Sequence, residues 1–503
     1  MAHKMLSHLP IGFMILSLTA SVAVESAYAA GKQGPREMSP KVKAVDHDSS
    51  VFSGDPIYED KPYSSDAQVE IYGGKRGLDA PRPLFEFLRP IYREGPFGQS
   101  GDAFGKKNLL AAGFNVTGDS RTAIALNDNG AAEVGQIATR LNLELDLKLT
   151  GTERIHAFLR PLDKNGNFTR HEFSADGDET EFELDGNIET LFFEGDVGSI
   201  LSGLRDEWSD IDLPFTFGKT PLLFQNGVWA EDAIVGGALA FAAKSSPALD
   251  ISNMDFTLFA GFDDVDTPAV KNGDGALNDD NLDVYGVATY FETREGYLEA
   301  GYGFLDGSGE FSEFGYHSLT AAFTKRYGGW LSNSVRGIWT FGQDADASGQ
   351  TADGGILLIE NSLITSKPST FIPYLNTWVG FDRPQPLMDN TGLLKNTGIV
   401  FETDGLTGFP TLDDTGHDTF GGAIGMQYLF NLDKQVVVEM ATVQIMGDKN
   451  ELGRAAESDQ YGFGLRYQQP ISDRLIVRAD AMYGALDEAD DVSGVRLELR
   501  VKF

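Results

Sequence analysis

Cysteine is absent from all 503 residues of this chain. The absence excludes disulfide bonds and every zinc or iron–sulfur site that needs cysteine ligands. Positive charge is also scarce, because 40 Lys and Arg stand against 75 Asp and Glu, which gives a formal net charge of -35. A nucleic-acid-binding protein would need a basic surface. The composition therefore argues against a nucleic-acid partner.

Catalytic motifs are missing as well. The chain contains no P-loop, no H-E-x-x-H and no G-x-S-x-G sequence at a strand–turn–helix. Only seven histidines are present, and no nucleophile, base and orienting acid can be assembled around them. We expect no catalytic residue, no metal site, no cofactor and no enzymatic activity.

Long hydrophobic runs are confined to the N-terminus. Lys4 precedes an apolar stretch over residues 9–24, and Ala27-Tyr28-Ala29 follows as a small-x-small sequence. The stretch is shorter than the ~20 residues of a spanning helix. We therefore predict a secretory signal peptide over residues 1–30, cleaved near Ala29 or Ala30. Because no other run is long enough to span a bilayer as a helix, insertion into a membrane would require a closed β-barrel.

Residues 31–108 lack periodicity and are rich in proline, glycine and charged residues. We predict a mostly irregular periplasmic extension here, with a short helix near residues 84–92. A folded plug inside a barrel is the alternative. The barrel itself is predicted over residues 109–503.

Amphipathic strands fill the chain from about Gly113 onward. The clearest is Arg140–Leu149, in which polar and apolar residues alternate strictly. A turn at Thr150-Gly151-Thr152 leads into a second strand, Arg154–Arg160, so the two form an antiparallel hairpin. One apolar and one polar face suit a wall between lipid and water.

The number of such strands is about eighteen, and they have roughly the 9–11 residues that a tilted spanning strand needs. Sixteen is the alternative, because residues 180–215 and 383–417 are ambiguous. We predict an all-β fold, a transmembrane antiparallel β-barrel with an even number of strands. The predicted strands begin near residues 113, 137, 153, 188, 213, 233, 252, 282, 295, 317, 329, 354, 370, 418, 435, 457, 474 and 492.

The last nine residues, Val495 to Phe503, form a very regular strand. Its odd-numbered residues are all apolar and the four residues between them are all charged. This pattern resembles the C-terminal signature of bacterial outer-membrane β-barrels, in which a final Phe marks the last strand for assembly. The resemblance implies a Gram-negative outer membrane as the location, and membrane lipid and the barrel-assembly machinery as partners.

The polar faces of the strands predict a basic interior wall. Closure of the barrel brings the last three strands beside the first three, and on these six strands basic residues outnumber acidic ones. Stacked guanidinium groups would attract anions and pass them along. In the alternative interpretation, acids and bases pair across strands and only make the wall soluble and rigid. The predicted pore-lining and selectivity residues are Arg121, Arg140, Lys148, Arg154, Arg160, Arg466, Arg478, Arg496 and Arg500.

Negative charge concentrates between the strands, for example in residues 263–266 and 487–491. Divalent cations bound by these carboxylates would bridge the loops to lipopolysaccharide, which makes lipopolysaccharide a predicted partner. Solvated loop charge is the simpler interpretation.

Residues 138–242 resemble the alginate-export family. The resemblance rests on the hairpin Arg140–Arg160 and on the segment Leu213–Lys219, which an Asn226-Gly227 turn follows. The chain departs from the family at Gly218-Lys219, where an Arg-Gln pair would be expected. Members of the family form eighteen-stranded barrels with an arginine-rich conduit for acidic polysaccharide. The resemblance therefore implies such an export conduit here.

From about Gly113 to Phe503 the chain looks like an outer-membrane porin. We predict a channel for passive diffusion of small hydrophilic solutes, with anions favoured by the arginine-lined lumen. A structural barrel that sheathes a redox or envelope partner, the polysaccharide conduit and a surface adhesin are the alternatives. The long segment 383–417 is a candidate for folding inward and narrowing the channel.

Overall fold

The computed structural model describes residues 82–91 and 100–503, except for residues 165, 175–176, 187, 274, 279, 347–348, 403–404, 431–433 and 448–455. The predicted signal peptide and most of the predicted N-terminal extension, including any plug, lie outside the described residues.

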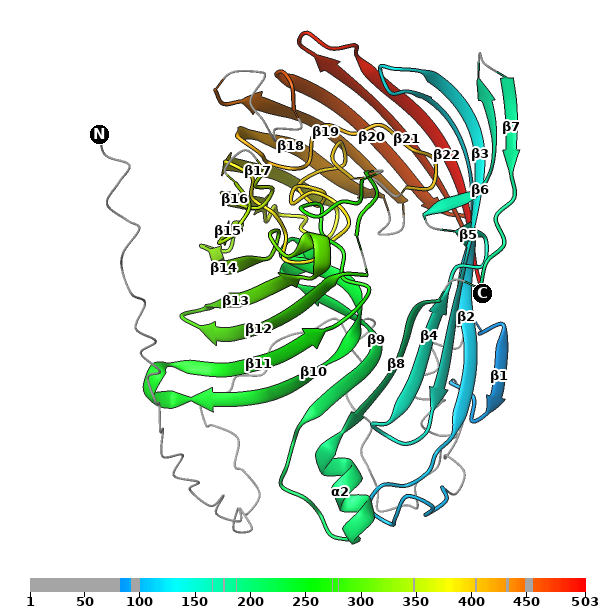
Figure 1. The fold of residues 1–503 in the computed structure, drawn as a ribbon. Coiled ribbons are helices and arrows are strands. Elements are labelled where there is room, and N and C mark those ends of the chain that lie inside the picture. The colour runs from blue at the N-terminus through cyan, green and yellow to red at the C-terminus, as the bar shows by residue number, and fades with distance from the viewer. Residues whose placement is uncertain are drawn as a thin grey trace, which may run out of the picture. The chain divides into compact units, whose positions relative to one another are not determined.

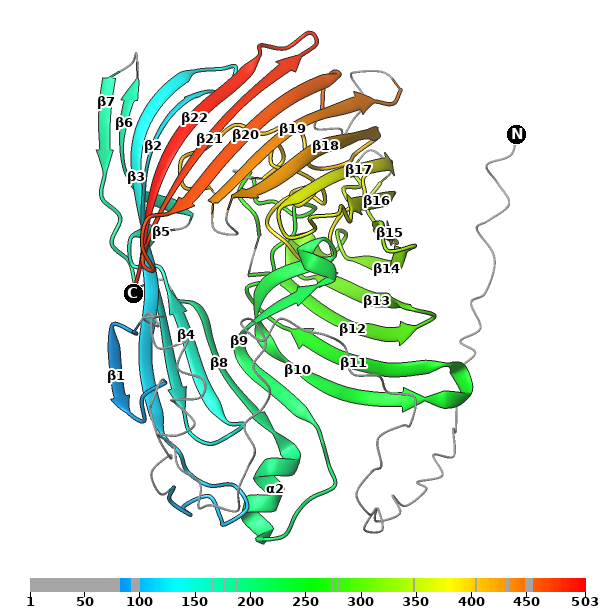
Figure 2. The same cartoon turned by 180° about the vertical axis from the view of Figure 1, so that it is seen from behind.

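Eighteen strands form one closed antiparallel wall (Figures 1 and 2). The last strand pairs with the first, from Asp119 opposite Lys502 to Asp128 opposite Ser493, so the wall has no end. The prediction of an all-β barrel with about eighteen strands is confirmed. The wall strands are β2 (Gly113–Asp128), β3 (Glu133–Lys148), β4 (Arg154–Leu159), β8 (Ile188–Asp196), β9 (Pro214–Phe224), β10 (Ala230–Ser246), β11 (Ile251–Gly261), β12 (Leu282–Thr293), β13 (Gly296–Gly307), β14 (Tyr316–Tyr327), β15 (Leu331–Phe341), β16 (Gly355–Leu363), β17 (Phe371–Phe381), β18 (Thr419–Phe430), β19 (Lys434–Ile445), β20 (Gln460–Pro470), β21 (Leu475–Leu486) and β22 (Val492–Lys502).

The remaining elements are short. They are the strands β1 (Phe85–Leu88), β5 (Asp163–Lys164), β6 (Asn167–Ser174) and β7 (Gly177–Glu181), the helix α2 (Val197–Arg205), and the 3-10 turns η2 (Gln225–Gly227), η3 (Pro247–Leu249) and η4 (Gly309–Phe311). Three of the strands belong to one excursion between β4 and β8. Residues 143–148 of β3 pair with β4, whereas residues 134–139 pair with β6, which in turn pairs with β7.

Each predicted strand start lies within four residues of an observed one. The largest difference is at β3, which begins at Glu133 because its pairing with β2 continues to Asp128. The ambiguous residues 180–215 contain β8 and the unpredicted helix α2. Asp196 caps this helix by accepting a hydrogen bond from the Ser199 backbone N–H at 2.6 Å.

The prediction of a helix near residues 84–92 is wrong. Residues 85–88 form the strand β1, which pairs with residues 113–116 of β2. The cause is tertiary: β22 reaches along β2 only as far as Asp119, so the first residues of β2 have a free edge. β1 satisfies that edge, and this pairing outweighs local propensity.

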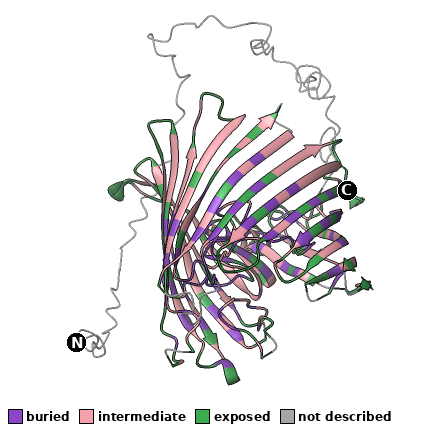
Figure 3. Ribbon diagram, turned by 90° about the horizontal axis from the view of Figure 1, so that it is seen from above, coloured by how far each residue is buried: buried purple, intermediate pink, exposed green. Residues whose placement is uncertain are grey.

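The two faces of the wall differ in exposure, as Figure 3 shows by the alternating colours along several strands. In β22, Leu497 and Leu499 are 52% and 44% exposed, whereas Arg496 and Glu498 are 5% and 3% exposed. In β22 the apolar residues therefore face outward, and around the wall Trp330, Trp339 and many leucines form an exposed belt. Among the described helices, none combines the length and the apolar character needed to cross a bilayer.

The connections differ in length at the two ends of the barrel. Phe503 lies at the end where most connections are short turns, such as residues 294–295 and 328–330, although residues 197–213 with α2 also join two strands there. The opposite end carries the long connections, and the longest joins β17 to β18 through residues 382–418. In bacterial barrels short turns are periplasmic and long loops extracellular. By the same rule, the end with Phe503 is the periplasmic end and the end with the connection 382–418 is the extracellular end.

Leu497→Arg would place a charge in lipid near the middle of β22. We expect the free energy of unfolding in phosphatidylcholine vesicles to fall by about 2–4 kcal/mol, measured by guanidinium titration of tryptophan fluorescence. Ala489→Arg introduces the same charge in an exposed loop and should change this free energy by less than about 0.5 kcal/mol. Equal losses for the two variants would contradict contact between the outer face and lipid.

Candidate functional site: the barrel interior

The strand register fixes which side chains face the interior. Because Leu497 is exposed and its neighbours Arg496 and Glu498 are buried, the even-numbered residues of β22 point inward. Arg496 lies opposite Asp480 of β21 and Ala125 of β2. Residues that lie opposite each other share a face, so Asp480 and Ala125 also point inward. Repeating this step around the wall places eight of the nine predicted pore residues on the inner face. The ninth directly follows β4.

Three arginines form a row across adjacent strands. Arg121 of β2 lies opposite Arg500 of β22 on one side and Arg140 of β3 on the other. Arg500 donates hydrogen bonds to Asp119, one of them from Nε to Oδ2 at 2.8 Å. The Nε atom of Arg121 lies 3.4 Å from Asp119 Oδ1. We call Arg500, Arg121 and Arg140 the arginine row.

The environment of the arginine row is partly buried. Asn142 donates a hydrogen bond to Asp119 Oδ1 at 2.9 Å, and Asp119 is only 5% exposed. The side chain of Arg500 remains 33% exposed and that of Arg121 17% exposed. The guanidinium of Arg140 lies 5.6 Å from the ring centre of Phe168. Arg121 and Arg500 therefore lie partly exposed on the inner surface, whereas Asp119, the carboxylate that both contact, is buried.

A second group of arginines surrounds Asp480. Arg466 and Arg478 donate from Nε to its two oxygens at 2.7 and 2.8 Å, and Arg496 donates from Nη2 at 2.7 Å. Glu402, from the connection between β17 and β18, accepts from Arg466 Nη1 at 2.6 Å and from Arg478 Nη2 at 3.3 Å. These three cations are held in ion pairs, as the second interpretation of the sequence expected.

The remaining predicted residues lie near β4. Arg154 pairs with Glu194 at 2.5 Å, and Lys148 is its exposed cross-strand partner. Arg160, just after β4, lies 3.2 Å from Glu189 and 3.6 Å from Asp163. The nine predicted residues thus form three groups along one side of the interior. They do not form one continuous ladder.

The connection between β17 and β18, residues 382–418, folds into the interior, and we call it the inward segment. Its first part runs beside β10. The Leu387 N–H donates to the Trp229 carbonyl at 2.8 Å, and the Met388 carbonyl accepts from Glu231 at 2.9 Å. Figures 1 and 2 show the segment, in yellow, surrounded by the wall.

The later part of the inward segment crosses to the opposite wall. Glu439 of β19 accepts from the backbone N–H groups of Ile399 and Val400, both at 3.0 Å. The Thr407 carbonyl accepts from the side chains of Asn127 of β2 and Gln136 of β3. The expectation that residues 383–417 fold inward agrees with this geometry.

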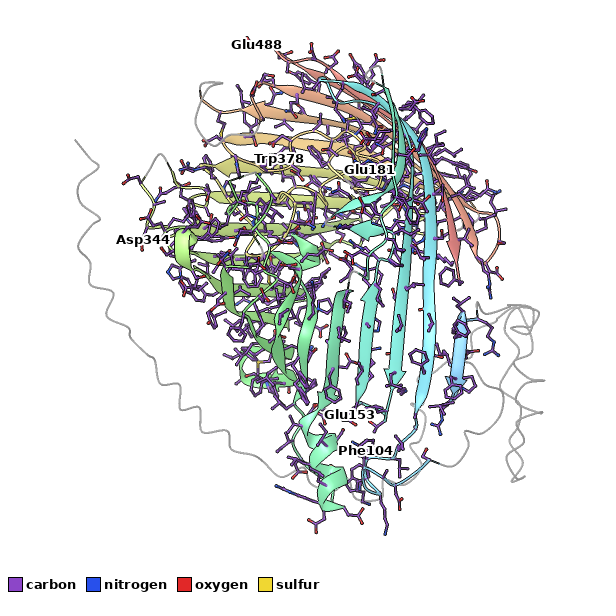
Figure 4. All side chains as sticks on the ribbon, turned by 45° about the vertical axis from the view of Figure 1, so that its right-hand side comes forward. Phe104, Glu153, Glu181, Asp344, Trp378 and Glu488 are labelled. Carbon is purple, nitrogen blue, oxygen red and sulfur yellow. The ribbon has the colours of Figure 1, made fainter. Side chains whose placement is uncertain are left out.

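The inward segment packs into a large apolar cluster that occupies the β10–β19 side of the interior. Wall strands supply Leu305, Ile338 and Trp378, the last labelled in Figure 4, and the segment supplies residues such as Leu387 and Phe401. The sequence analysis missed this cluster. The available signal was Ile356-Leu357-Leu358-Ile359 in β16, which is apolar on both faces and so cannot have lipid on one and water on the other.

Glycines on the inner face allow the segment to approach the wall. A Cβ added at Gly303 would lie 2.3 Å from Leu387 Cδ2, and one at Gly494 would lie 2.7 Å from Pro410 Cδ. Inward-facing glycines thus mark where the segment docks.

Carboxyl groups are buried within the inward segment. Burial raises the pKa of Asp413 to about 6, and burial together with the neighbouring Asp413 raises the pKa of Asp414 to about 7. Burial also raises the pKa of Asp389, although Lys395 lies beside it. Asp414 accepts a hydrogen bond from the Gly392 N–H at 3.2 Å and so joins the two ends of the segment.

Within residues 82–91 and the described part of 100–503, no three His, Asp or Glu side chains gather as a metal-binding group.

Comparisons with known proteins bear on the fold. No protein-family model and no curated protein matches the chain. The crystal structure of Pseudomonas aeruginosa OccK1 (OpdK) is similar, with 12% identity and a TM-score of 0.50 over 78% of this chain and 98% of OccK1. That of P. aeruginosa OccK7 (OpdD) has 9% identity and a TM-score of 0.50 over 78% of this chain and 98% of OccK7. These neighbours are outer-membrane porins.

This chain has the fold of an outer-membrane porin. The closed wall and its apolar outer belt suit a barrel whose outer face contacts membrane lipid. At these identities the likeness establishes the fold. The comparisons do not show the resemblance to the alginate-export family.

Low pH should tighten docking of the inward segment. The docked state raises the pKa values of Asp413 and Asp414, so it binds more protons than an undocked one, and docking gains stability as the pH falls through about 7 and 6. We expect hydrogen exchange of residues 392–400, corrected for intrinsic rates, to slow between pH 8 and pH 5.

Asp414→Asn should reproduce this slow exchange at pH 8, because it removes the buried charge. Asp487→Asn, in an exposed loop, is the control and should leave the profile unchanged. Corrected exchange that does not vary with pH in the unmodified protein would refute the linkage.

Proposed function

We propose that the protein is a passive diffusion channel for small hydrophilic solutes, with a preference for anions that carry a carboxylate. The observation that supports this most directly is the arginine row. Like charges that lie opposite each other on neighbouring strands destabilise the pairing. Three guanidinium groups in register therefore have a cost that a role in the folded wall alone does not explain.

The chemistry of the row suits a mobile carboxylate. Arg500 and Arg121 share Asp119, and the exposed part of Arg500 faces the interior. A guanidinium group offers several N–H donors in one plane, so it can keep one carboxylate partner and accept another. A solute carboxylate that shares a guanidinium group with Asp119 is bound weakly and exchanges quickly, which conduction requires.

The other arginine groups support a path beside the row. Arg466, Arg478 and Arg496 are bound to Asp480 and covered by the inward segment, so they offer little to a passing anion. Arg154 and Lys148 are more exposed and lie closer to the periplasmic end. We place the solute path along β22, β2, β3 and β4.

A structural barrel without conduction is the alternative, and the extent of the apolar cluster favours it. The cluster fills the β10–β19 side of the interior from within the chain itself. Stepwise single-channel currents in planar bilayers would support the channel. Purified, folded protein that gives no current would support the structural barrel.

Arg121→Gln should reduce the preference for anions. We expect reversal potentials under a KCl gradient to show anion preference in the unmodified protein, and the ratio of anion to cation permeability to fall about threefold in the variant. Lys106→Gln makes the same charge change on a side chain that is 74% exposed outside the wall. It should have no effect. Cation preference in the unmodified protein would overturn the proposal.

A further inference from the structure

A cavity of about 700 Å³ lies at the periplasmic end of the wall. Its lining comes from the ends of β11 to β15 and from the turns at residues 247–250 and 294–295. The arginine row lies on β22, β2 and β3, which are on another side of the ring. We call this space the periplasmic cavity. None of the predicted pore residues lines it.

The strand register shows that the periplasmic cavity belongs to the interior. Leu305 of β13 is fully buried in the apolar cluster, and Tyr297 lies eight residues away on the same strand, so both face inward. Tyr297 lies opposite Glu292 of β12 and Thr324 of β14. Arg326 follows Thr324 by two residues and shares its face. All four of these inward-facing residues line the cavity.

Tyr297 presents an aromatic surface to this space. Its side chain is 38% exposed, and the ring centre of Tyr290, its diagonal neighbour on the inner face of β12, lies 5.6 Å from its own. Seven described tyrosines are exposed, and the register turns all of them outward except Tyr297. The six that face outward are Tyr285, Tyr302, Tyr327, Tyr428, Tyr461 and Tyr483.

Contact with lipid explains an exposed ring on the outer face, because tyrosine suits the region where acyl chains meet water. It does not explain Tyr297. Aromatic side chains that line a concave, polar space are typical of sites for small molecules. The ring of Tyr297 therefore indicates a ligand with a flat apolar face.

The charges of the periplasmic cavity are balanced. Three acidic and three basic residues line it, namely Asp250, Glu292, Glu295, Arg294, Lys325 and Arg326. Lys325 pairs with Glu295 at 3.2 Å and donates to the Arg294 carbonyl at 3.0 Å. Glu292 and Arg326 are both exposed, and no ion pair within the described part of the chain involves either of them.

This combination matches a neutral sugar. A hydroxyl group both donates and accepts, so it can donate to the Glu292 carboxylate and accept from the Arg326 guanidinium. The C–H groups on one face of a sugar ring pack against an aromatic ring. An anion would meet the charge of Glu292, and a cation that of Arg326. A small zwitterion meets both charges but has no flat face for Tyr297.

We propose that the periplasmic cavity binds neutral saccharides, with one sugar ring stacked on Tyr297 and its hydroxyl groups bonded to Glu292 and Arg326. The volume of about 700 Å³ is in the range of small-molecule sites. The site is separate from the arginine row, so it does not depend on the anion preference proposed above.

Binding of cellobiose, a neutral disaccharide with flat rings, tests the site. The full-length protein is purified in a detergent without a sugar headgroup and titrated by isothermal calorimetry. We expect saturable binding with a dissociation constant of about 1 mM. Tyr297→Ala should weaken it at least about tenfold, because the stacking surface is lost. Tyr297→Phe keeps the ring and should stay within about twofold of the unmodified protein.

Two further variants control this result. Tyr302→Ala removes a tyrosine of similar exposure, 42%, from the outer face of the same strand, and it should leave binding unchanged. Arg326→Gln should weaken binding about fivefold through loss of a charged hydrogen bond. Because the Arg326 side chain is exposed at the end of β14, this variant tests the site even if Tyr297→Ala does not fold. Heat-modifiable mobility on a gel checks the fold of every variant.

The ligand class is tested with succinate, alanine and choline as an anion, a zwitterion and a cation. Binding of any of them as tight as that of cellobiose would overturn the class. Absence of cellobiose binding up to about 50 mM would overturn the site, and so would equal weakening by Tyr297→Ala and Tyr302→Ala. Protein that binds cellobiose but gives no current in bilayers would refute only the channel.

Discussion

The requirement that every backbone hydrogen-bonding group in lipid be satisfied governs this structure. A wall of strands meets it only by closing, and the pairing of Asp119 with Lys502 through Asp128 with Ser493 completes the ring. Closure fixes the register, and the register decides that Leu497 faces lipid while Arg496 faces inward. The exposed apolar belt and the charged interior both follow from that one constraint.

A large part of the interior is filled with packed side chains. The inward segment brings its own apolar side chains against the β10–β19 wall, and inner-face glycines such as Gly303 give it room. Its polar backbone is satisfied by wall side chains, including Glu439 and Asn127. The solute path that we propose lies on the other side of the interior, beside β22, β2, β3 and β4, where the arginine row lies.

The arginines of the interior divide between the two roles that their pattern allows. Those around Asp480 are bound by carboxylates and stabilise the contact with Glu402 of the inward segment. In the arginine row, Arg121 and Arg500 share Asp119 and lie in register with Arg140, and we propose that the row accepts a further anion. The same residue type thus stabilises one part of the wall and is proposed to select solutes in another.

The sequence by itself determined the strands, their number and their two faces, because strict alternation such as Arg140–Leu149 has a two-residue period that no other element shares. It could not determine what fills the interior. Contacts between Leu387 and Gly303, or between Thr407 and Asn127, join residues far apart in the chain and leave no local pattern. The strand β1 and the inward segment were decided by tertiary structure, since each depends on which strand edges and inner surfaces remain uncovered once the wall has closed.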